Sequence, residues 1–182
     1  GSKSICLGYN NKTGGRKNMA KSNEKIETGK DKLFKLSVPF KDEDISWRIQ
    51  RMKKDGTAGL VLGYINVRQV QDRLTEVMGT DWQCKHEVFG GKTICHLGLK
   101  LDGNWIWRSD GAGDTQFEAD KGAISDSLKR SAVAFGVGRH LYDLPDNMWV
   151  NCESKVVNGK AYFKKFLENP LDVLRRKRAD FR

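Results

Sequence analysis

The sequence predicts an α+β fold with an antiparallel β-β-β-α core, in which a three-stranded meander plus an extra short strand is covered by one long helix. Three runs of alternating apolar and polar residues follow one another and are separated by short turns that contain glycine. A helix-period stripe comes directly after them, and shorter helix and strand patterns precede them. The resulting order, αβαβββα, favours an antiparallel sheet with one dominant covering helix.

The N-terminal segment, residues 1–36, is expected to be disordered. It is rich in Gly, Asn, Lys and Ser and has almost no periodic apolar signal. Its first two residues, Gly-Ser, resemble a cleavage scar. We therefore interpret residues 1–18 as derived from a tag or vector, and Met19 as a candidate native start.

A first helix is expected between Phe40 and Lys54. Acidic residues at 42–44 would lie at its positive end. Its apolar face would consist of Ile45, Ile49 and Met52.

The run from Gly59 to Ile65 is expected to form the extra short strand. Asn66 follows it and can N-cap a second helix, which Gly79 would close. The apolar face of that helix is formed by Val67, Val70, Leu74, Val77 and Met78.

The meander is predicted over three strands, Trp82–Val88, Thr93–Leu101 and Asn104–Asp110. The first turn contains two glycines, and the second is Asp102-Gly103. On the third strand two tryptophans, Trp105 and Trp107, share one face because strand side chains alternate. One of them would offer a stacking platform for a base, or both would pack in the core, and we favour the core.

The long helix is predicted over about 117–135 and crosses back over the meander. Its apolar stripe recurs at spacings of four, four and three and consists of Ile124, Leu128, Ala132 and Phe135. Beyond the folded domain, 37–150, we expect an extension over 151–182. An Asn-Gly hairpin signal lies within 156–162, and Asn169-Pro170 starts a basic terminal helix.

Positive charge is concentrated at the two ends of the chain. Residues 1–35 contain nine Lys and Arg against three Asp and Glu, residues 155–182 contain the same numbers, and the middle carries a net charge of −2. A near-neutral body with basic ends suits a protein that binds polyanions. Solubilising charge on flexible ends fits these counts equally well.

Several classes of site are not favoured by the sequence. It lacks the phosphate-binding loop of ATP-driven motors and the common zinc motifs, and no apolar run approaches membrane-spanning length. The four cysteines show no disulfide framework, which indicates a reducing, cytoplasmic compartment. The candidate metal cluster is Cys84, His86, Cys95 and His96. Adjacent residues 95 and 96 point to opposite faces of a strand, so all four cannot easily converge, and we expect no metal or other cofactor.

A cluster of carboxylates is the one feature that suggests an enzyme. Asp110, Asp114, Glu118 and Asp120 together resemble the acidic group of a Mg²⁺-dependent nuclease. They also lie around a helix N-terminus, where acids stabilise the helix dipole, and we favour this structural interpretation. The sequence therefore predicts a protein that is not an enzyme.

Single-stranded nucleic acid is the ligand that the remaining signals favour. Lys129, Arg130 and Arg139 lie on or just after the long helix and can contact phosphates along a groove. The alternative is a solvated helix face in which Asp126 and Arg130 form an ordinary i,i+4 pair.

Two stretches of the chain resemble the Rad52/22 family of single-strand annealing recombination proteins, and its phage and prophage members most. The specific part is S-D-S-L-K-R-S-A-V-A-F-G-V-G-R-H-L-Y-D-L (125–144), preceded by G-D-T-Q-F-E-A-D-K-G (113–122). Tyr64-Ile65 and T-E-V-M-G-T-D-W (75–82) are similar to an earlier family segment. The resemblance covers about 60–145.

The resemblance implies an ATP-independent annealing protein, active in homologous recombination and double-strand break repair, that forms rings with single-stranded DNA along a basic groove. Lys129 and Arg130 match the family's paired basic residues, whereas Val133 stands where a further basic residue is usual. A family arginine on the second helix carries over to Arg68, beside Gln69.

Lys121 and Arg108 complete the set of candidate DNA-contact residues. A host single-strand-binding protein is a further expected partner, in the cytoplasm of a bacterial host. Two alternatives stay open: a Mg²⁺-dependent nuclease, and a single-stranded DNA- or RNA-binding module that does not anneal. The family's long partner-binding C-terminal region is not expected in this chain.

Overall fold

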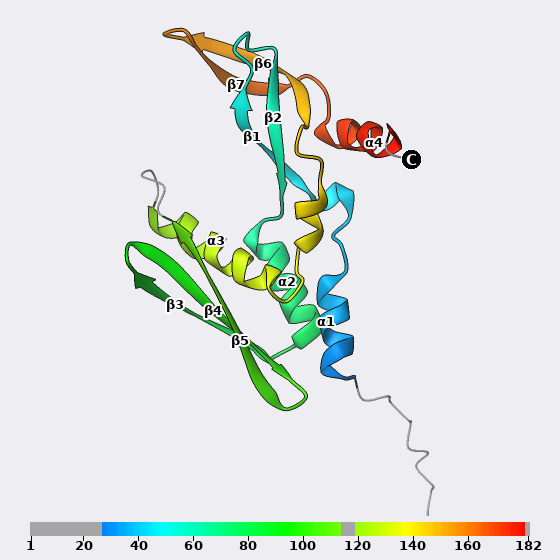
Figure 1. Ribbon diagram of the computed structural model, residues 1–182, viewed down its shortest axis with the longest axis vertical. Coiled ribbons are helices and arrows are strands. Elements are labelled where there is room, and N and C mark those ends of the chain that lie inside the picture. The colour runs from blue at the N-terminus through cyan, green and yellow to red at the C-terminus, as the bar shows by residue number, and fades with distance from the viewer. Residues whose placement is uncertain (1–26, 114–118, 181–182) are drawn as a thin grey trace, which may run out of the picture.

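The computed structural model describes residues 27–113 and 119–180, which form two antiparallel sheets with four α-helices. Figure 1 shows the two sheets at opposite ends of the longest axis, with α1, α2 and α3 beside the lower one and α4 beside the upper one. The lower sheet has the strand order β3-β4-β5, and the upper sheet has the order β1-β2-β6-β7. The predicted α+β class is thus observed, but with a second sheet that the sequence analysis did not separate.

The lower sheet is the predicted meander. Its strands are β3 (Trp82–Phe89), β4 (Lys92–Leu101) and β5 (Asn104–Gly113). The second hairpin turns through Asp102 and Gly103, with φ of 47° and 83°. These left-handed values are those of a type I′ turn, and they explain why Asp-Gly is a good hairpin signal here.

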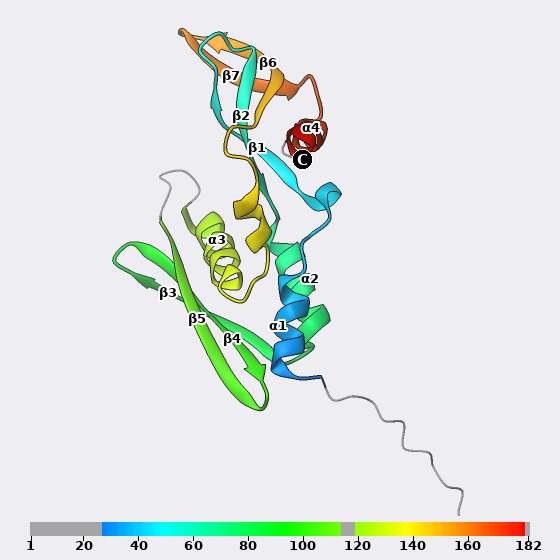
Figure 2. The same ribbon diagram turned by 45° about the vertical axis from the view of Figure 1, so that its right-hand side comes forward.

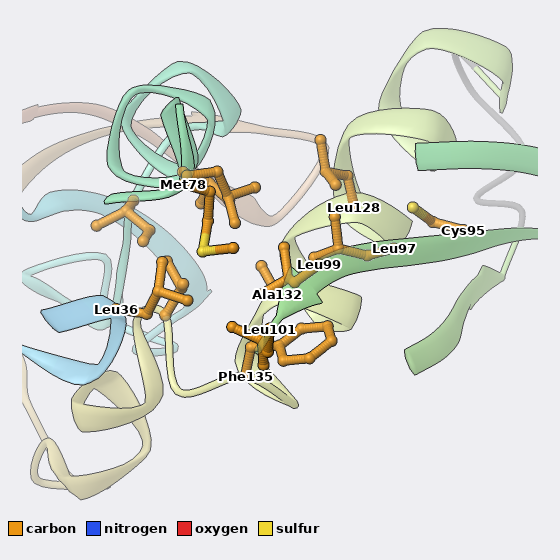
Figure 3. Close-up of a cluster of buried hydrophobic side chains, with 13 residues drawn as sticks. Leu36, Met78, Cys95, Leu97, Leu99, Leu101, Leu128, Ala132 and Phe135 are labelled. Carbon is orange, nitrogen blue, oxygen red and sulfur yellow. The ribbon is translucent and has the colours of Figure 1, made fainter. Parts of the chain in front are cut away.

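Helix α3 (Ala119–Val133) covers the inner face of the meander, as predicted. Figure 3 shows side chains of β4 meeting those of α3 and the turn after it in one apolar cluster. The labelled members from these segments are Cys95, Leu97, Leu99, Leu101, Leu128, Ala132 and Phe135. Burying each large aliphatic side chain contributes about 1.5–3 kcal/mol, so this cluster is the main stabilising contact of the lower half.

The predicted apolar stripe of α3 is wrong at one residue. Ile124 is 46% exposed, whereas Ser127 and Ser131 are fully buried. The Ser131 hydroxyl donates to the Cys95 carbonyl at 2.8 Å and accepts from the Asp110 amide at 3.0 Å. Two small hydroxyl side chains thus let the helix approach the sheet closely, a role that apolar periodicity does not reveal.

The N-terminal segment is helical where disorder was expected. Helix α1 covers Gly29–Ser37, and Thr28 and Asp31 form a reciprocal capping box at its start. Leu36 is fully buried in the lower core, against α2. The expectation of disorder is therefore wrong for residues 29–36, because one cap and one buried leucine suffice when α2 supplies the packing surface. Residues 1–26 lie outside the described part of the chain.

The expected helix after Phe40 is also wrong. A short 3₁₀ turn, Asp42–Asp44, is followed by strand β1 (Ser46–Met52). The pairing of β1 with β2 is irregular between Ile49 and Arg51. A bulge of this kind shifts the alternation by one residue, so Ile49 and Met52 share a face despite their odd separation. Their spacing therefore imitates a helix period.

Two elements near the middle match the predictions. Strand β2 (Ala58–Tyr64) leads into α2 (Val67–Met78), whose N-cap Asn66 exchanges hydrogen bonds with Gln69. Gly79 ends the helix with φ of 59°, which favours glycine. Strand β2 is the predicted extra strand, but it pairs with β1 and β6 rather than joining the meander.

The upper sheet unites residues on both sides of the predicted boundary at 150. Strand β6 (Trp149–Val157) spans this boundary and pairs with β2, so the part of the expected extension that forms β6 and β7 belongs to the second sheet. The Asn-Gly hairpin connects β6 to β7 (Lys160–Phe166), and α4 (Pro170–Asp180) follows as predicted. The buried cluster here consists of Val61, Met148, Val150, Val173 and Leu174. None of the helices in the described ranges has the length and apolar character needed to span a bilayer.

Candidate nucleic-acid interface

A cleft of about 960 Å³ lies between α3 and the β1–β2 part of the upper sheet. Its first wall is the α3 face with Asp126, Lys129, Arg130 and Val133. Its second wall is formed by residues 47, 48 and 50 of β1 and by residues 61–64 of β2. Figure 2 shows α3 between the meander and the segment that holds the 3₁₀ turn Arg139–Asp143. Parts of that segment, 137–146, close the cleft at one side.

Lys129 lies within the cleft and is positioned by two contacts. Its Nζ atom is 2.8 Å from Asp126 Oδ1 and 5.8 Å from the centre of the Tyr64 ring. The side chain is only 26% exposed, so its methylene stem is largely packed while the ammonium group is held at the cleft surface. A phosphate that approaches here meets a cation whose direction is already set.

Arg130 lies at the edge of the same wall, on a support provided by β5. Its Nε atom donates to Asp110 Oδ1 at 3.1 Å, and the same oxygen accepts from the Gly111 amide at 2.7 Å. The Asp110 amide in turn donates to the buried Ser131 hydroxyl. The Arg130 side chain remains 53% exposed, and its guanidinium can form further hydrogen bonds outward.

The expected pair between Asp126 and Arg130 is not formed. Asp126 pairs with Lys129 at i,i+3, and Arg130 pairs across to the sheet instead. The two adjacent cations therefore have separate carboxylate partners, which fixes each one independently.

Arg139 has a different position from the predicted one. It is not among the residues that line the cleft, and its Nη2 atom donates to the Val133 carbonyl at 3.0 Å. A cation at this carbonyl stabilises the C-terminal end of α3. Val133 itself lines the cleft. Arg139 thus lies next to Val133, the position where the family pattern has a basic residue. Its charge stabilises the C-terminal end of α3.

Of the other three predicted contact residues, Arg108 and Arg68 do not line the cleft. Arg108 donates to the Trp107 carbonyl, and its guanidinium lies 5.7 Å from the Phe135 ring centre, near the far end of α3. Arg68 is exposed on α2 and makes no hydrogen bond or ion pair with other described residues. The side chain of Lys121 lies outside the described part of the chain.

Two cations that line the cleft were missed by the sequence analysis. Arg48 lies on β1 and Lys92 lies at the start of β4, and both are exposed. Neither makes an ion pair or hydrogen bond with other residues that the structure describes. Among the residues that the structure describes, four cations and two carboxylates, Asp126 and Asp146, line the cleft, so these residues give it a positive charge on balance. The signal for Arg48 was hidden by the wrong assignment of β1 as a helix.

Aromatic side chains of three segments also line the cleft. Trp47 and Tyr64 belong to its second wall, and Tyr142, which is 70% exposed, lies in the 3₁₀ turn. Rings next to cations are suited to stacking with bases while the cations contact the backbone. A site of this composition can bind a single strand without reading its sequence.

Trp105 and Trp107 lie on the outer face of the meander, and the preferred placement in the core is wrong. They are 41% and 37% exposed, because α3 covers the opposite face of β5. A Cβ atom at Gly98 would lie 2.9 Å from the Trp107 ring, so the indole packs on bare backbone. Lys85 Nζ lies 5.8 Å from the same ring.

The carboxylate cluster is only partly within the described residues. Asp110 is described, and its carboxylate is bound by Arg130 and the Gly111 amide. Asp114, Glu118 and the side chain of Asp120 lie outside the described residues. The described carboxylate of this cluster, Asp110, thus supports Arg130 of the cleft wall.

The predicted divergence of the Cys/His group is confirmed. Cys84, His86 and Cys95 meet on the inner face of the meander, with their ligand atoms within 4.8 Å of one another. His96 lies on the other face, where it contacts Ser109 and Glu87. Burial raises the pKa of both thiols, to about 11 for Cys95, so they are protonated near neutral pH.

Part of the chain matches a known protein family. Residues 95–159 match the model of the Rad52/22 family double-strand break repair proteins. This segment includes β4 from Cys95 on, β5, α3, and β6 with the turn that follows it, and therefore the first wall of the cleft. It extends beyond the resemblance seen in the sequence at its C-terminal side and does not include 60–94.

Two curated relatives are both called single-stranded DNA-binding protein DdrA. The chain is 37% identical to the Deinococcus radiodurans protein over 113 residues, which is 61% of this chain and 54% of that one. It is 37% identical to the Deinococcus deserti protein over 118 residues, or 64% and 58%. The chain thus spans just over half the length of these relatives. No solved structure matches significantly.

Proposed function

We propose that this chain is a member of the Rad52/22 family, because residues 95–159 match that family's model and two relatives are 37% identical to the chain. We propose further that it binds single-stranded DNA in the cleft between α3 and the β1–β2 strands and promotes annealing of complementary strands. The observation that carries this proposal is the pair Lys129 and Arg130, held by separate carboxylates on one wall of a cleft that is positive on balance. The names of the two relatives support single-stranded DNA as the ligand.

Binding begins with the DNA backbone. Phosphates approach Lys129 and Arg130 and compete with their carboxylate partners, while Arg48 and Lys92 add charge from the opposite wall and the rim. Released counterions favour binding, and the logarithm of the affinity falls by about 0.7 per neutralised phosphate for each tenfold rise in salt. The cleft aromatics limit the motion of bases without selecting among them.

Annealing then requires that the bound strand keeps its base edges accessible. Contacts to phosphates leave those edges free, and correct pairing with a second strand yields a stiffer duplex that fits the cleft less well. Pairing itself supplies the free energy, so the proposed reaction needs no nucleotide hydrolysis. We therefore place the protein among DNA-binding proteins of recombination and repair and not among enzymes.

Assembly of several copies into a ring is part of the proposal. A single cleft contacts few nucleotides, whereas adjacent clefts on a ring would hold one strand extended over many. Sedimentation velocity should give a mass several times the 20.6 kDa of one chain. The proposed setting is the bacterial cytoplasm, where a host single-strand-binding protein would compete for or hand over the strands.

The test is annealing of two complementary fluorescent oligonucleotides, without ATP or metal, over a salt series. We expect fast pairing that slows as salt rises. Lys129→Ala and Arg130→Ala should each slow pairing and reduce the salt slope of binding by about 0.7. Lys160→Ala is the control, because Lys160 is exposed on β7 and is not among the cleft residues. Normal binding and pairing by both cleft variants, in folded protein, would refute the site.

The same assay separates the alternatives. A single-strand-binding module that does not anneal would show normal binding without faster pairing. A nuclease would shorten the oligonucleotides when Mg²⁺ is added, and gel analysis of the products detects this. The proposal predicts full-length strands in both conditions, because the described carboxylate of Asp110 is engaged by Arg130.

A further inference from the structure

Three side chains with ligating atoms meet on the inner face of the meander. Cys84 and His86 are two residues apart on β3, so they point to one face, and His86 is paired directly with Cys95 on β4. The two sulfur atoms and the imidazole nitrogen all lie within 4.8 Å of one another. Cys95 is buried, Cys84 is half-buried and His86 is exposed, so the group opens to solvent on the histidine side.

The two histidines of these strands differ sharply in their contacts. His96 uses both ring nitrogens: Nδ1 lies 2.7 Å from Ser109 Oγ, and Nε2 lies 3.0 Å from Glu87 Oε1. His86 makes no hydrogen bond or ion pair within the described ranges, although it lies beside two sulfur atoms. An imidazole in these surroundings retains a free nitrogen lone pair, which metal coordination would use.

The cysteines show a similar contrast. Cys152 is buried in the upper sheet, where its sulfur lies 3.9 Å from the Met52 sulfur. It has no place in the group of metal-ligating side chains found among the described residues. Cys152 and His96 are therefore a cysteine and a histidine that lie outside the group of Cys84, His86 and Cys95. They serve as controls for the residues in that group.

We propose that Cys84, His86 and Cys95 form a zinc-binding site with water as the fourth ligand. Thiolate and imidazole are the ligands that Zn²⁺ prefers, and three protein ligands plus water complete a tetrahedron. Zinc–sulfur and zinc–nitrogen bonds of about 2.3 and 2.0 Å place tetrahedral ligand atoms about 3.5–3.8 Å apart. Small side-chain rotations at the two cysteines and the exposed histidine suffice to close the present spacing.

Binding at this site joins the edge strand β3 to the central strand β4. The two thiol protons are released to solvent as the sulfur atoms bond to the ion, and the imidazole binds in its neutral form. Because the ligand set exists only when the strands are paired, zinc binding stabilises the folded state over the unfolded one. The proposed site is separate from the DNA cleft, since none of its three residues lines that cleft.

The test uses the full chain with Cys6→Ser and Cys152→Ala, which leaves Cys84 and Cys95 as the only thiols. Titration with Co²⁺ under reducing, anaerobic conditions should give a thiolate-to-cobalt charge-transfer band and tetrahedral visible bands that saturate at one ion per chain. Addition of Zn²⁺ should remove both. Competition with a chromophoric chelator then gives the zinc affinity.

Single substitutions locate the site. Cys84→Ser, His86→Asn and Cys95→Ala should each weaken zinc binding by at least about tenfold, and the two cysteine variants should also weaken the charge-transfer band. His96→Asn should leave affinity and spectrum unchanged. Far-ultraviolet circular dichroism checks that each variant is folded. If Cys95→Ala unfolds the protein because Cys95 is buried, the conservative Cys84→Ser variant still tests the site.

Two results would overturn the proposal. One is a parent spectrum without the charge-transfer band, or one that the three ligand substitutions do not change. The other is a Cys84–Cys95 disulfide that forms in the same reducing buffer and prevents metal binding. A rise in the zinc-dependent melting temperature that is lost in Cys84→Ser and kept in His96→Asn would support it independently.

Discussion

The two walls of the cleft present their cations in opposite ways. On the α3 wall, Lys129 and Arg130 are each held by a carboxylate, 2.8 and 3.1 Å away. On the β1 wall, Arg48 has no ion-pair partner among the described residues, and Lys92 at the rim has none either. The carboxylates therefore fix the directions of Lys129 and Arg130 and neutralise part of their charge. The side chains of Arg48 and Lys92 have no such restraint from described residues, so they can move with a bound strand.

This difference suggests a division of roles. Pre-positioned cations lose little side-chain entropy when a phosphate arrives, but the phosphate must displace a carboxylate. Unpaired cations lose more side-chain entropy when they bind a phosphate, but they need not give up a carboxylate partner. Their Coulomb attraction to the phosphate is strongly screened by salt. We expect the α3 wall to determine where the backbone lies and the other wall to determine how steeply binding depends on salt.

The largest expected effect comes from removing the packing beneath the α3 wall. Leu97→Ala should lower the free energy of unfolding by about 2–5 kcal/mol, because this fully buried side chain fills the space between β4 and α3. Leu174→Ala, which is equally buried beneath the upper sheet, should cost a similar amount. Urea unfolding followed by circular dichroism measures both. An unchanged midpoint for Leu97→Ala would contradict the packing described for the α3 wall.

A smaller loss is expected at the hydrogen-bonded support of Arg130. Ser131→Ala removes the hydroxyl between the Cys95 carbonyl and the Asp110 amide and should destabilise the fold by about 1–3 kcal/mol. Ser127→Ala is the matched control, since among the described residues that equally buried hydroxyl donates only to the Ile124 carbonyl of its own helix. Equal losses in the two variants, measured by urea unfolding, would mean that the link to β5 adds nothing.

Arg48→Ala tests the contribution of the opposite wall. It should reduce the salt slope of single-stranded DNA binding by about 0.7 and leave the fold intact, because the side chain is exposed and unpaired among the described residues. Arg68→Ala is the matched arginine control, outside the cleft on α2. Fluorescence anisotropy over a salt series measures both. A larger change for Arg68 than for Arg48 would favour a path for the strand along α2.

The smallest effect is expected at Glu168, which links α4 to β6. The Asn151 amide and the Arg176 guanidinium lower the pKa of this carboxyl from its ordinary value of 4.5. A lowered pKa in the folded state stabilises the protein above that ordinary value, and the contribution is lost as pH falls through the folded pKa. Glu168→Gln should therefore cost below about 1 kcal/mol at pH 7 and nothing in strong acid. A cost that persists in strong acid would show that charge is not its origin.

The sequence predicted the elements whose signals are local. Asn66 and Gly79 mark the ends of α2, Asp102-Gly103 marks a hairpin, and the stripe with Leu128 and Ala132 marks α3. Each of these depends on a few neighbouring residues, so no tertiary information is needed. Lys129 and Arg130 could be identified for the same reason, because they directly follow Leu128 of that stripe.

The remaining features depend on contacts between distant segments. The bulge in β1 imitates a helix period, and it concealed Arg48 and with it the second wall. Strand alternation placed Trp105 and Trp107 on one face, but only the position of α3 decides which face is covered. Leu36 is buried because α2 lies beside it, a fact that the composition around α1 cannot reveal.

The most direct test of the central claim is photo-crosslinking of a single strand that contains 5-iodouracil, followed by mass spectrometry of the linked peptides. We expect adducts at the cleft aromatics Trp47, Tyr64 or Tyr142, which Lys129→Ala should reduce. Adducts confined to Trp105 and Trp107 would contradict it. They would place the strand on the outer face of the meander, beside Lys85 and away from α3.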